Sequence, residues 1–290
     1  MFKLNNITNL IRNIKKVSIH IKPICSVRKI HTTNNENKIY KIQKMDENTH
    51  INTINQNEKL RKYITDVYKY TGTGFGTTLG VSIASSAIIP YIPILEIVPV
   101  VWIGGIGTSF YSLYKMNNIY SITKTDLTED IPIEKKKYYT MFTISNGIML
   151  TPIVFVSFLV NPTILPIALT STIATFGGAT YFALKQSNLD MLKIGAPLMG
   201  GVCGLIGTNL VVLGAGYFGF IKFAETLDII SAMASVGIFT GLIVYDTHKA
   251  IDDFNNRTLD TINRSVELLL DMTNLLVDFI KLLIRLNQKQ

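Results

Sequence analysis

Polar residues in the stretch 265–286 recur with the spacing of an α-helix. Successive polar positions are four, three, four, three and four residues apart: Glu267, Asp271, Asn274, Asp278, Lys281 and Arg285. At 3.6 residues per turn they form one stripe on a helix whose remaining surface is almost wholly apolar. Such a pattern predicts either a membrane helix whose stripe faces the interior of a bundle or an amphipathic helix at a surface.

Six long apolar stretches precede this helix, and they favour the first interpretation. Each is close to the length needed to cross a bilayer. They lie at residues 71–89, 97–116, 140–160, 163–184, 192–214 and 226–246. Together with 265–286 they predict an all-α membrane domain of seven transmembrane helices over residues 59–290.

Two of these spans carry small residues at every fourth position, which predicts faces where helices approach closely. These residues are Gly72, Gly76, Gly80 and Ala84 in the first span and Ala196, Gly200, Gly204 and Thr208 in the fifth. A phosphate-binding loop is excluded for the first set, because no strand precedes it and no Lys-Ser/Thr pair completes it.

The N-terminal region differs from the rest of the chain in composition. Residues 1–33 are basic and contain no acid, the first acid being Glu36, and they lack the unbroken apolar stretch of a secretory signal. This pattern is typical of a mitochondrial transit peptide processed near residue 30, and the alternative is a disordered basic arm. Residues 34–58 are rich in Asn and have no apolar period, which predicts a disordered linker.

The composition agrees with a polytopic membrane protein. The chain is 48% hydrophobic and 17% charged, with a mean hydropathy of +0.30. The net charge of +8 is spread over the leader and several short loops, so nucleic acid is not an expected partner. Cys25 and Cys203 lie in unlike surroundings and indicate neither a disulfide framework nor a metal site.

Basic residues in the connections predict the orientation. If seven segments cross, those before the first span and in alternate connections all lie on one side, and the opposite connections contain only Lys222. The basic residues on the first side are Lys59, Arg61, Lys62, Lys69, Lys115, Lys124, Lys135, Lys136, Lys137, Lys185, Lys193, Lys249, Arg257 and Arg264. The positive-inside rule then places the mature N-terminus in the matrix, for a protein of the mitochondrial inner membrane.

Two aspartates are the strongest candidates for function. Asp246 ends the sixth span, and Asp271 follows about two turns into the last helix, roughly 9 Å from its start at 1.5 Å per residue. After an expected connection of residues 247–264, both enter from the same side. Paired carboxyl groups in a poorly solvated place tend to share a proton, and their oxygens also suit Ca²⁺.

The remaining polar residues have lesser expected roles. Glu267 and Asn274, on the same stripe, are candidate supporting oxygen ligands, whereas Asp278 is expected to be neutralised by Lys281 and Arg285. An ion-pair network that only locks the last helix is the alternative for the whole stripe. His248 is a candidate proton relay or an interfacial residue, and the loop acids Asp252, Asp253 and Asp260 are expected to be solvated. No catalytic triad or metalloprotease motif is present, so an enzyme is not expected.

Several segments resemble the transmembrane Bax-inhibitor-motif family. The resemblance rests on Tyr245-Asp246-Thr247 at the end of the sixth span and on residues 270–276, LDMTNLL, in the last helix. It covers about residues 60–286. The mitochondrial branch, that of the growth-hormone-inducible transmembrane protein, is most similar, with matches at residues 68–72, 195–198 and 260–263.

The resemblance implies seven helices with the last one central. It also implies a Ca²⁺ leak or Ca²⁺/H⁺ exchange pathway gated by two aspartates, which map onto Asp246 and Asp271. The mitochondrial branch is linked to cristae organisation and to restraint of apoptosis. Some relatives place a basic residue in the second span as partner of the first aspartate, and Lys115 is the candidate for it here.

Two other functions remain as alternatives. A scaffold that binds inner-membrane protein partners without transport is compatible with the polar head and the charged loops. An intramembrane aspartyl protease also uses two aspartates on adjacent spans, but its Gly-x-Gly-Asp sequence is missing, since Leu268-Leu269-Leu270 precedes Asp271. The expected partners are the lipid bilayer, Ca²⁺ and H⁺, with no cofactor apart from the ion.

Overall fold

The computed structural model of the protein describes residues 36–89, 94–123, 129–185 and 189–288. Seven long α-helices follow one another in these residues. They are α2 (Glu36–Ile88), α3 (Ile94–Asn118), α4 (Ile133–Val160), α5 (Ile164–Lys185), α6 (Gly195–Tyr217), α7 (Ile221–Asn255) and α8 (Thr261–Asn287). A 3-10 helix, η2 (Leu189–Ile194), precedes α6, and two short antiparallel strands, β1 (Ile122–Thr123) and β2 (Glu129–Asp130), lie between α3 and α4.

The seven predicted spans correspond to these seven helices, which confirms the all-α membrane fold. Four segments in the described residues are long and apolar enough by themselves to cross a membrane: α4, α5, residues 191–217 and α7. Helix α7 is longer than predicted and continues to Asn255, because Ala250 and Phe254 extend its buried apolar face. The connection to α8 is therefore residues 256–260 instead of 247–264.

The N-terminal predictions have different outcomes. Residues 34–58 were expected to be a disordered linker, but α2 begins at Glu36, and the sequence from there to Glu58 contains no Gly or Pro to stop a helix. The predicted transit peptide, residues 1–33, lies outside the described residues. Residues 54–290 form one compact unit, and the packing described here is that of this unit.

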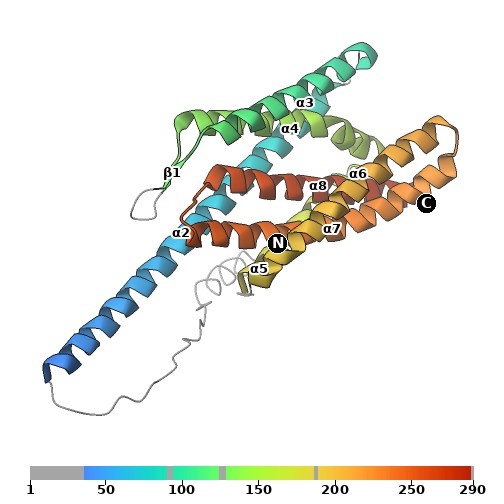
Figure 1. Cartoon of the computed structure of the whole chain (residues 1–290). Coiled ribbons are helices and arrows are strands. Elements are labelled where there is room, and N and C mark those ends of the chain that lie inside the picture. The colour runs from blue at the N-terminus through green and yellow to red at the C-terminus, as the bar shows by residue number, and fades with distance from the viewer. Residues whose placement is uncertain (1–35, 90–93, 124–128, 186–188, 289–290) are drawn as a thin grey trace, which may run out of the picture. The chain divides into compact units, whose positions relative to one another are not determined.

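Helix α8 is the central element of this unit (Figure 1). It packs against α4, α5 and α7, and its buried residues recur from Thr261 to Ile284. Hydrogen bonds join it to α2: Ser265 Oγ donates to the carbonyl of Val67 (2.9 Å), and Thr71 Oγ1 donates to the carbonyl of Ser265 (3.4 Å). Helices α3 and α6 lie outside, packed on α4 and α7 respectively. The predicted central position of the last helix is confirmed.

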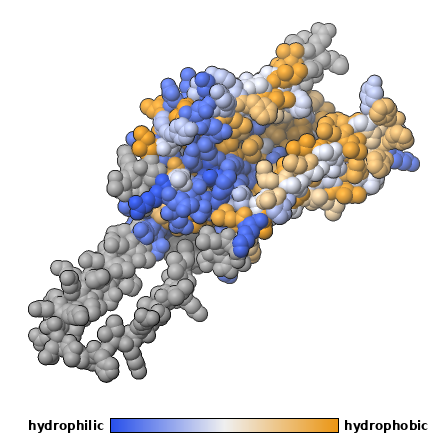
Figure 2. All heavy atoms as spheres, in the orientation of Figure 1, coloured by the Kyte–Doolittle hydropathy of each residue, from blue (hydrophilic) through white to orange (hydrophobic). Residues whose placement is uncertain are grey.

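Exposed apolar helices and a buried polar stripe distinguish this bundle from a soluble protein. Helix α6 contains no charged residue, yet its apolar side chains are exposed, with Leu210 at 64% and Leu213 at 70%. Figure 2 shows the apolar surface that α6 and α7 present. Helix α8, which carries the polar stripe, is buried. Hydrocarbon around the bundle explains both facts, since lipid solvates Leu but not a carboxylate.

The predicted small-residue faces are not where these helices meet. A Cβ atom on Gly72, Gly76, Gly200 or Gly204 would meet nothing within 4 Å. The close contact is instead between α2 and α4 at Gly147, where a Cβ atom would lie 2.6 Å from the carbonyl oxygen of Thr78. Sequence spacing identified helices with a small-residue face, but this chain turns that face outward.

We expect Gly147→Ala to destabilise the protein by about 1–3 kcal/mol, because the new methyl group overlaps the α2 backbone. Gly76→Ala is the matched control: it adds the same methyl group to an exposed helical position and should be neutral or stabilising by up to about 1 kcal/mol. Thermal unfolding of the detergent-solubilised variants measures the difference. Equal melting temperatures for the two variants would contradict the α2–α4 contact.

Candidate functional site

The two predicted aspartates meet in the α7–α8 seam, the contact between α7 residues 225–253 and α8 residues 261–285. Asp246 lies on α7 and is 7% exposed, and Asp271 lies on α8 and is 5% exposed. Their carboxyl groups interact directly across the seam. Asp246 on α7 faces Asp271 on α8 across the seam, so the two acids lie side by side.

A contact between two carboxyl groups requires a proton or a cation. Two carboxylates can only accept hydrogen bonds, so a direct bond between them needs one to be protonated. Oδ2 of Asp271 is buried and has no hydrogen-bond donor in the described part of the protein. A shared proton would supply that donor, and loss of the proton would leave two like charges in a place with little water.

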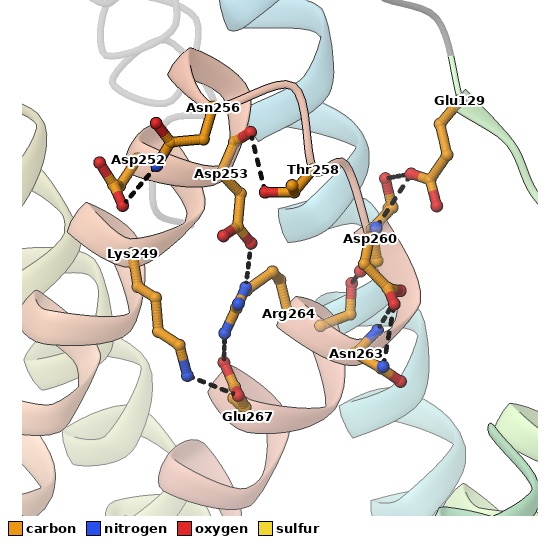
Figure 3. Close-up of polar contacts among 12 residues, drawn as sticks. Glu129, Lys249, Asp252, Asp253, Asn256, Thr258, Asp260, Asn263, Arg264 and Glu267 are labelled. Atoms are coloured by element: carbon orange, nitrogen blue, oxygen red, sulfur yellow. Dashed lines mark hydrogen bonds and ion pairs between the residues drawn. The ribbon is translucent and has the colours of Figure 1, made fainter. Parts of the chain in front are cut away.

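An ion-pair cluster lies about one helical turn from the pair, toward the α7–α8 connection; Figure 3 shows this cluster. Lys249 Nζ lies 3.0 Å from Glu267 Oε1, and Arg264 binds the other oxygen of Glu267 at 2.5 Å. The same guanidinium group binds Asp253 through Nε. Glu267, a predicted ion ligand, is therefore neutralised by two bases.

Two of the three loop acids expected to be solvated, Asp253 and Asp260, instead hold structural contacts. Asp260 is the N-cap of α8 and accepts hydrogen bonds from the backbone N–H (3.1 Å) and the Nδ2 (2.9 Å) of Asn263. Asp253 binds Arg264, and only Asp252 matches the expectation, with an exposed hydrogen bond from Asn256 (3.0 Å). The helical extension of α7 accounts for this, because it carries Asp253 up to the first turn of α8.

Lys135, which the sequence indicated only as one of the loop bases, is fully buried. Its Nζ lies 2.8 Å from Asp260 Oδ2 and donates to the carbonyl of Ile119 at 2.9 Å. Glu129 of β2 accepts a hydrogen bond from the backbone N–H of Thr261 (2.9 Å) and another from its hydroxyl group. The hairpin and the start of α4 therefore fix the N-terminus of α8.

The other predicted residues lie apart from the pair. Asp278 is buried and accepts a hydrogen bond from Ser235 of α7, while Arg285, its expected partner, binds Asp228 instead (3.0 Å). Lys115 lies over the ring of Tyr111, 5.7 Å from its centroid, and has no described contact with Asp246. Asn274 is half-buried between the two acids of its stripe.

His248, a candidate proton relay or interfacial residue, is buried, with 3% of its surface exposed. Its Nε2 atom has no hydrogen-bond partner in the described residues. Tyr68 of α2, which sequence reasoning missed, makes a 2.6 Å hydrogen bond to Thr247, next to Asp246. No spacing rule links residues so far apart in sequence, so only the fold places this hydroxyl pair beside the site.

Few metal-ligating side chains accompany the pair in the described residues. No group of three or more His, Cys, Asp or Glu side chains in the described residues is arranged to hold a metal ion. Ca²⁺ takes six to eight oxygen ligands, so two carboxylates would leave most of its coordination to water. Two carboxyl groups alone would bind Ca²⁺ weakly, and the same oxygen atoms can bind protons.

A central helix with a buried polar stripe, packed among six other apolar helices, is the architecture of a polytopic helical membrane protein. The family model described as Inhibitor of apoptosis-promoting Bax1 matches residues 60–289, and the chain belongs to that family, the Bax-inhibitor family.

Two relatives are similar over part of the chain. Protein lifeguard 4 of Mus musculus is 29% identical over 118 residues, which are 41% of this chain and 45% of the relative. Golgi anti-apoptotic protein of Vaccinia virus (strain Lister) is 30% identical over 118 residues, 41% of this chain and 46% of the relative. The matched segment thus spans just under half the length of each relative.

We expect Lys135→Met to destabilise the protein by about 3 kcal/mol, because it leaves Asp260 without its buried partner. Lys136→Met is the matched control, since Lys136 is exposed and the next residue in sequence. Chemical or thermal unfolding in detergent measures both. If the two variants unfold alike, Lys135 does not hold the α8 N-terminus.

Proposed function

We propose that this protein restrains cell death from within a membrane by passing Ca²⁺ along the α7–α8 seam, under control of Asp246 and Asp271. The observation that carries the proposal is the buried contact between these two carboxyl groups. The family match supports the link to cell death, as does the name of the vaccinia relative, Golgi anti-apoptotic protein.

The proposed pathway has two states. When the pair holds a proton, the carboxyl groups hydrogen-bond and keep α7 against α8. When the proton leaves, two like charges in a poorly solvated seam repel each other, and the free energy falls if Ca²⁺ binds between them or the seam opens. Protonation therefore closes the pathway and deprotonation opens it.

Coupling between Ca²⁺ and H⁺ follows from the shared oxygen atoms. A divalent ion that binds the pair displaces its proton, because both ligands compete for the same lone pairs. Uptake of Ca²⁺ on one side and release on the other then moves protons in the opposite direction. A Ca²⁺ leak results if the proton step is slow, and Ca²⁺/H⁺ exchange results if it is obligatory. The residues indicate no catalytic reaction, so the proposed role is not enzymatic.

The proposed location is the mitochondrial inner membrane, with the mature N-terminus in the matrix. The basic, acid-free residues 1–33 and the charge asymmetry of the connections support this location. Roles in cristae organisation, through inner-membrane protein partners, are part of the same proposal. The vaccinia relative is named for the Golgi, so location is a property to be tested for this chain by itself.

In liposomes with Ca²⁺ and pH dyes, Asp271→Asn should abolish the pH dependence of Ca²⁺ flux. The amide keeps the shape of the carboxyl group and its hydrogen bonding but cannot lose a proton in this range. Asp246→Asn should act in the same way. Asp252→Asn is the control, because it makes the same chemical change at an exposed hydrogen bond to Asn256.

Purified protein that moves no Ca²⁺ at any imposed pH gradient would refute transport. Transport along the seam is also refuted if the double variant Asp246→Asn, Asp271→Asn behaves as the wild type. A double variant that also leaves every cellular phenotype intact would favour the non-transporting scaffold. Retention of wild-type melting temperatures by the variants separates loss of transport from loss of folding.

The orientation has its own test on mitoplasts. A protease site inserted at residue 60 should be protected when only the intermembrane face is accessible, and it should be cleaved after the inner membrane is opened. A site inserted near residue 219, between α6 and α7, is the control and should be cleaved first. Protection of residue 219 together with cleavage at residue 60 would reverse the topology, and an intact leader in purified mitochondria would refute processing near residue 30.

A further inference from the structure

A third buried carboxyl group lies in the seam, two turns further along α8 than Asp271. Asp278 is 5% exposed, and its Oδ2 accepts a hydrogen bond from Ser235 Oγ, which is also 5% exposed. Seven residues of helix separate Asp278 from Asp271, which corresponds to roughly 10 Å along the axis. Asp278 is therefore a separate polar position from the di-aspartate site.

Few charged groups face Asp278. Lys281 of α8 and Asp228 of α7 act on it electrostatically, and Asp228 is itself bound to Arg285. The other helices packed on α8 bring none: Asp, Glu, Lys and Arg are absent from residues 70–88 of α2, 138–160 of α4 and 164–184 of α5. The partner of Asp278 is thus a neutral hydroxyl group.

The surroundings of Asp278 differ from those of the charged residues at the two ends of the seam, which form ion pairs. Arg264, Lys249 and Glu267 neutralise one another at one end, and Arg285 binds Asp228 (3.0 Å) and Glu225 (3.8 Å) at the other. No ion pair joins Asp278 to Lys281 in the described part of the chain. A carboxylate held only by a hydroxyl group in an apolar interior keeps its charge at high cost, and a bound proton removes that cost.

We propose that Asp278 and Ser235 form a second proton-binding site in the seam, between the di-aspartate pair and the Arg285–Asp228 ion pair. This inference rests on the proposed function and extends it: protons that exchange with Ca²⁺ travel along the seam by way of Asp278. Half-buried Asn274 lies between Asp271 and Asp278 on the same stripe, and its amide group can both donate and accept hydrogen bonds. One carboxylate and one hydroxyl group are too few oxygens for Ca²⁺, so the proton is the ligand.

A hydrophobic carbodiimide tests proton binding without reference to transport. Dicyclohexylcarbodiimide reacts with protonated carboxyl groups in apolar surroundings, and mass spectrometry locates the adduct. We expect labelling of Asp278 in the reconstituted full chain, decreasing as the pH rises. Asp252, whose hydrogen bond to Asn256 is exposed, is the control and should stay unlabelled. The double variant Asp246→Asn, Asp271→Asn should keep this labelling, because Asp278 binds its proton independently.

Ser235→Ala provides the second variant and keeps the carboxyl group. It should still be labelled at Asp278, but the pH at which labelling is half-maximal should change, because the hydroxyl group no longer binds the carboxylate. Thr226→Ala is the matched control, since it removes an exposed hydroxyl group of the same helix that bonds only to its own backbone. No change with Ser235→Ala would remove Ser235 from the site.

Proton flux tests the role of the site in transport. In liposomes with a Ca²⁺ gradient, Asp278→Asn should lower the accompanying H⁺ flux by about ten-fold or more, while Ca²⁺ still binds the di-aspartate pair. Undiminished H⁺ flux in this variant, or no Asp278 adduct at any pH when another carboxyl group is labelled, would overturn the proposal. If wild-type protein moves no Ca²⁺, the proposed function fails, and the labelling still decides whether Asp278 binds a proton.

Discussion

The cost of placing charge in hydrocarbon determines how this bundle is built. The membrane portions of α2, α4 and α5 contain no Asp, Glu, Lys or Arg, and neither does α6. Apart from the Lys135–Asp260 pair at the N-terminus of α8, the buried charged residues that the structure describes are gathered in the seam between α7 and α8, where they face one another and not lipid. Helix α8 occupies the centre because its polar stripe has partners only there, and the apolar helices surround it with lipid-facing surface (Figure 1).

Ion pairs join the charged residues at the two ends of the seam, whereas the carboxyl groups in its middle have no such partner in the described residues. Arg264 joins Asp253 to Glu267 at one end, and Arg285 joins Asp228 to Glu225 at the other. Between them lie Asp246, Asp271 and Asp278, which contact a carboxyl or a hydroxyl group and form no ion pair in the described residues. Ion pairs fix the ends of the two helices, so changes of protonation act on the middle of the seam.

Close contacts indicate which parts move together. A Cβ atom on Gly195 of α6 would lie 2.5 Å from the ring of Tyr245, and one on Gly241 of α7 would lie 2.9 Å from Leu198. Helices α6 and α7 thus interlock on both sides of their contact and are expected to move as one body. On the other side, Ser265 and Thr71 bind α2 to α8. In the proposed pathway, opening at the di-aspartate pair breaks the Tyr68–Thr247 hydrogen bond, which joins α2 to α7 beside the pair.

Apolar length and helical spacing determined the number of helices, their order and the stripe on α8, because each depends on residues near one another in sequence. They also identified Asp246 and Asp271 as buried acids, since a carboxyl group within a long apolar helix must face the interior of the bundle and not lipid. The pairing of charges was decided by tertiary structure. Asp278 accepts a hydrogen bond from Ser235 instead of pairing with Lys281, and Asp260 forms an ion pair with buried Lys135. The glycine faces of α2 and α6 point outward. In each case the outcome depended on the rotation of one helix against another, which arises from packing between segments distant in sequence and leaves no local periodicity to read.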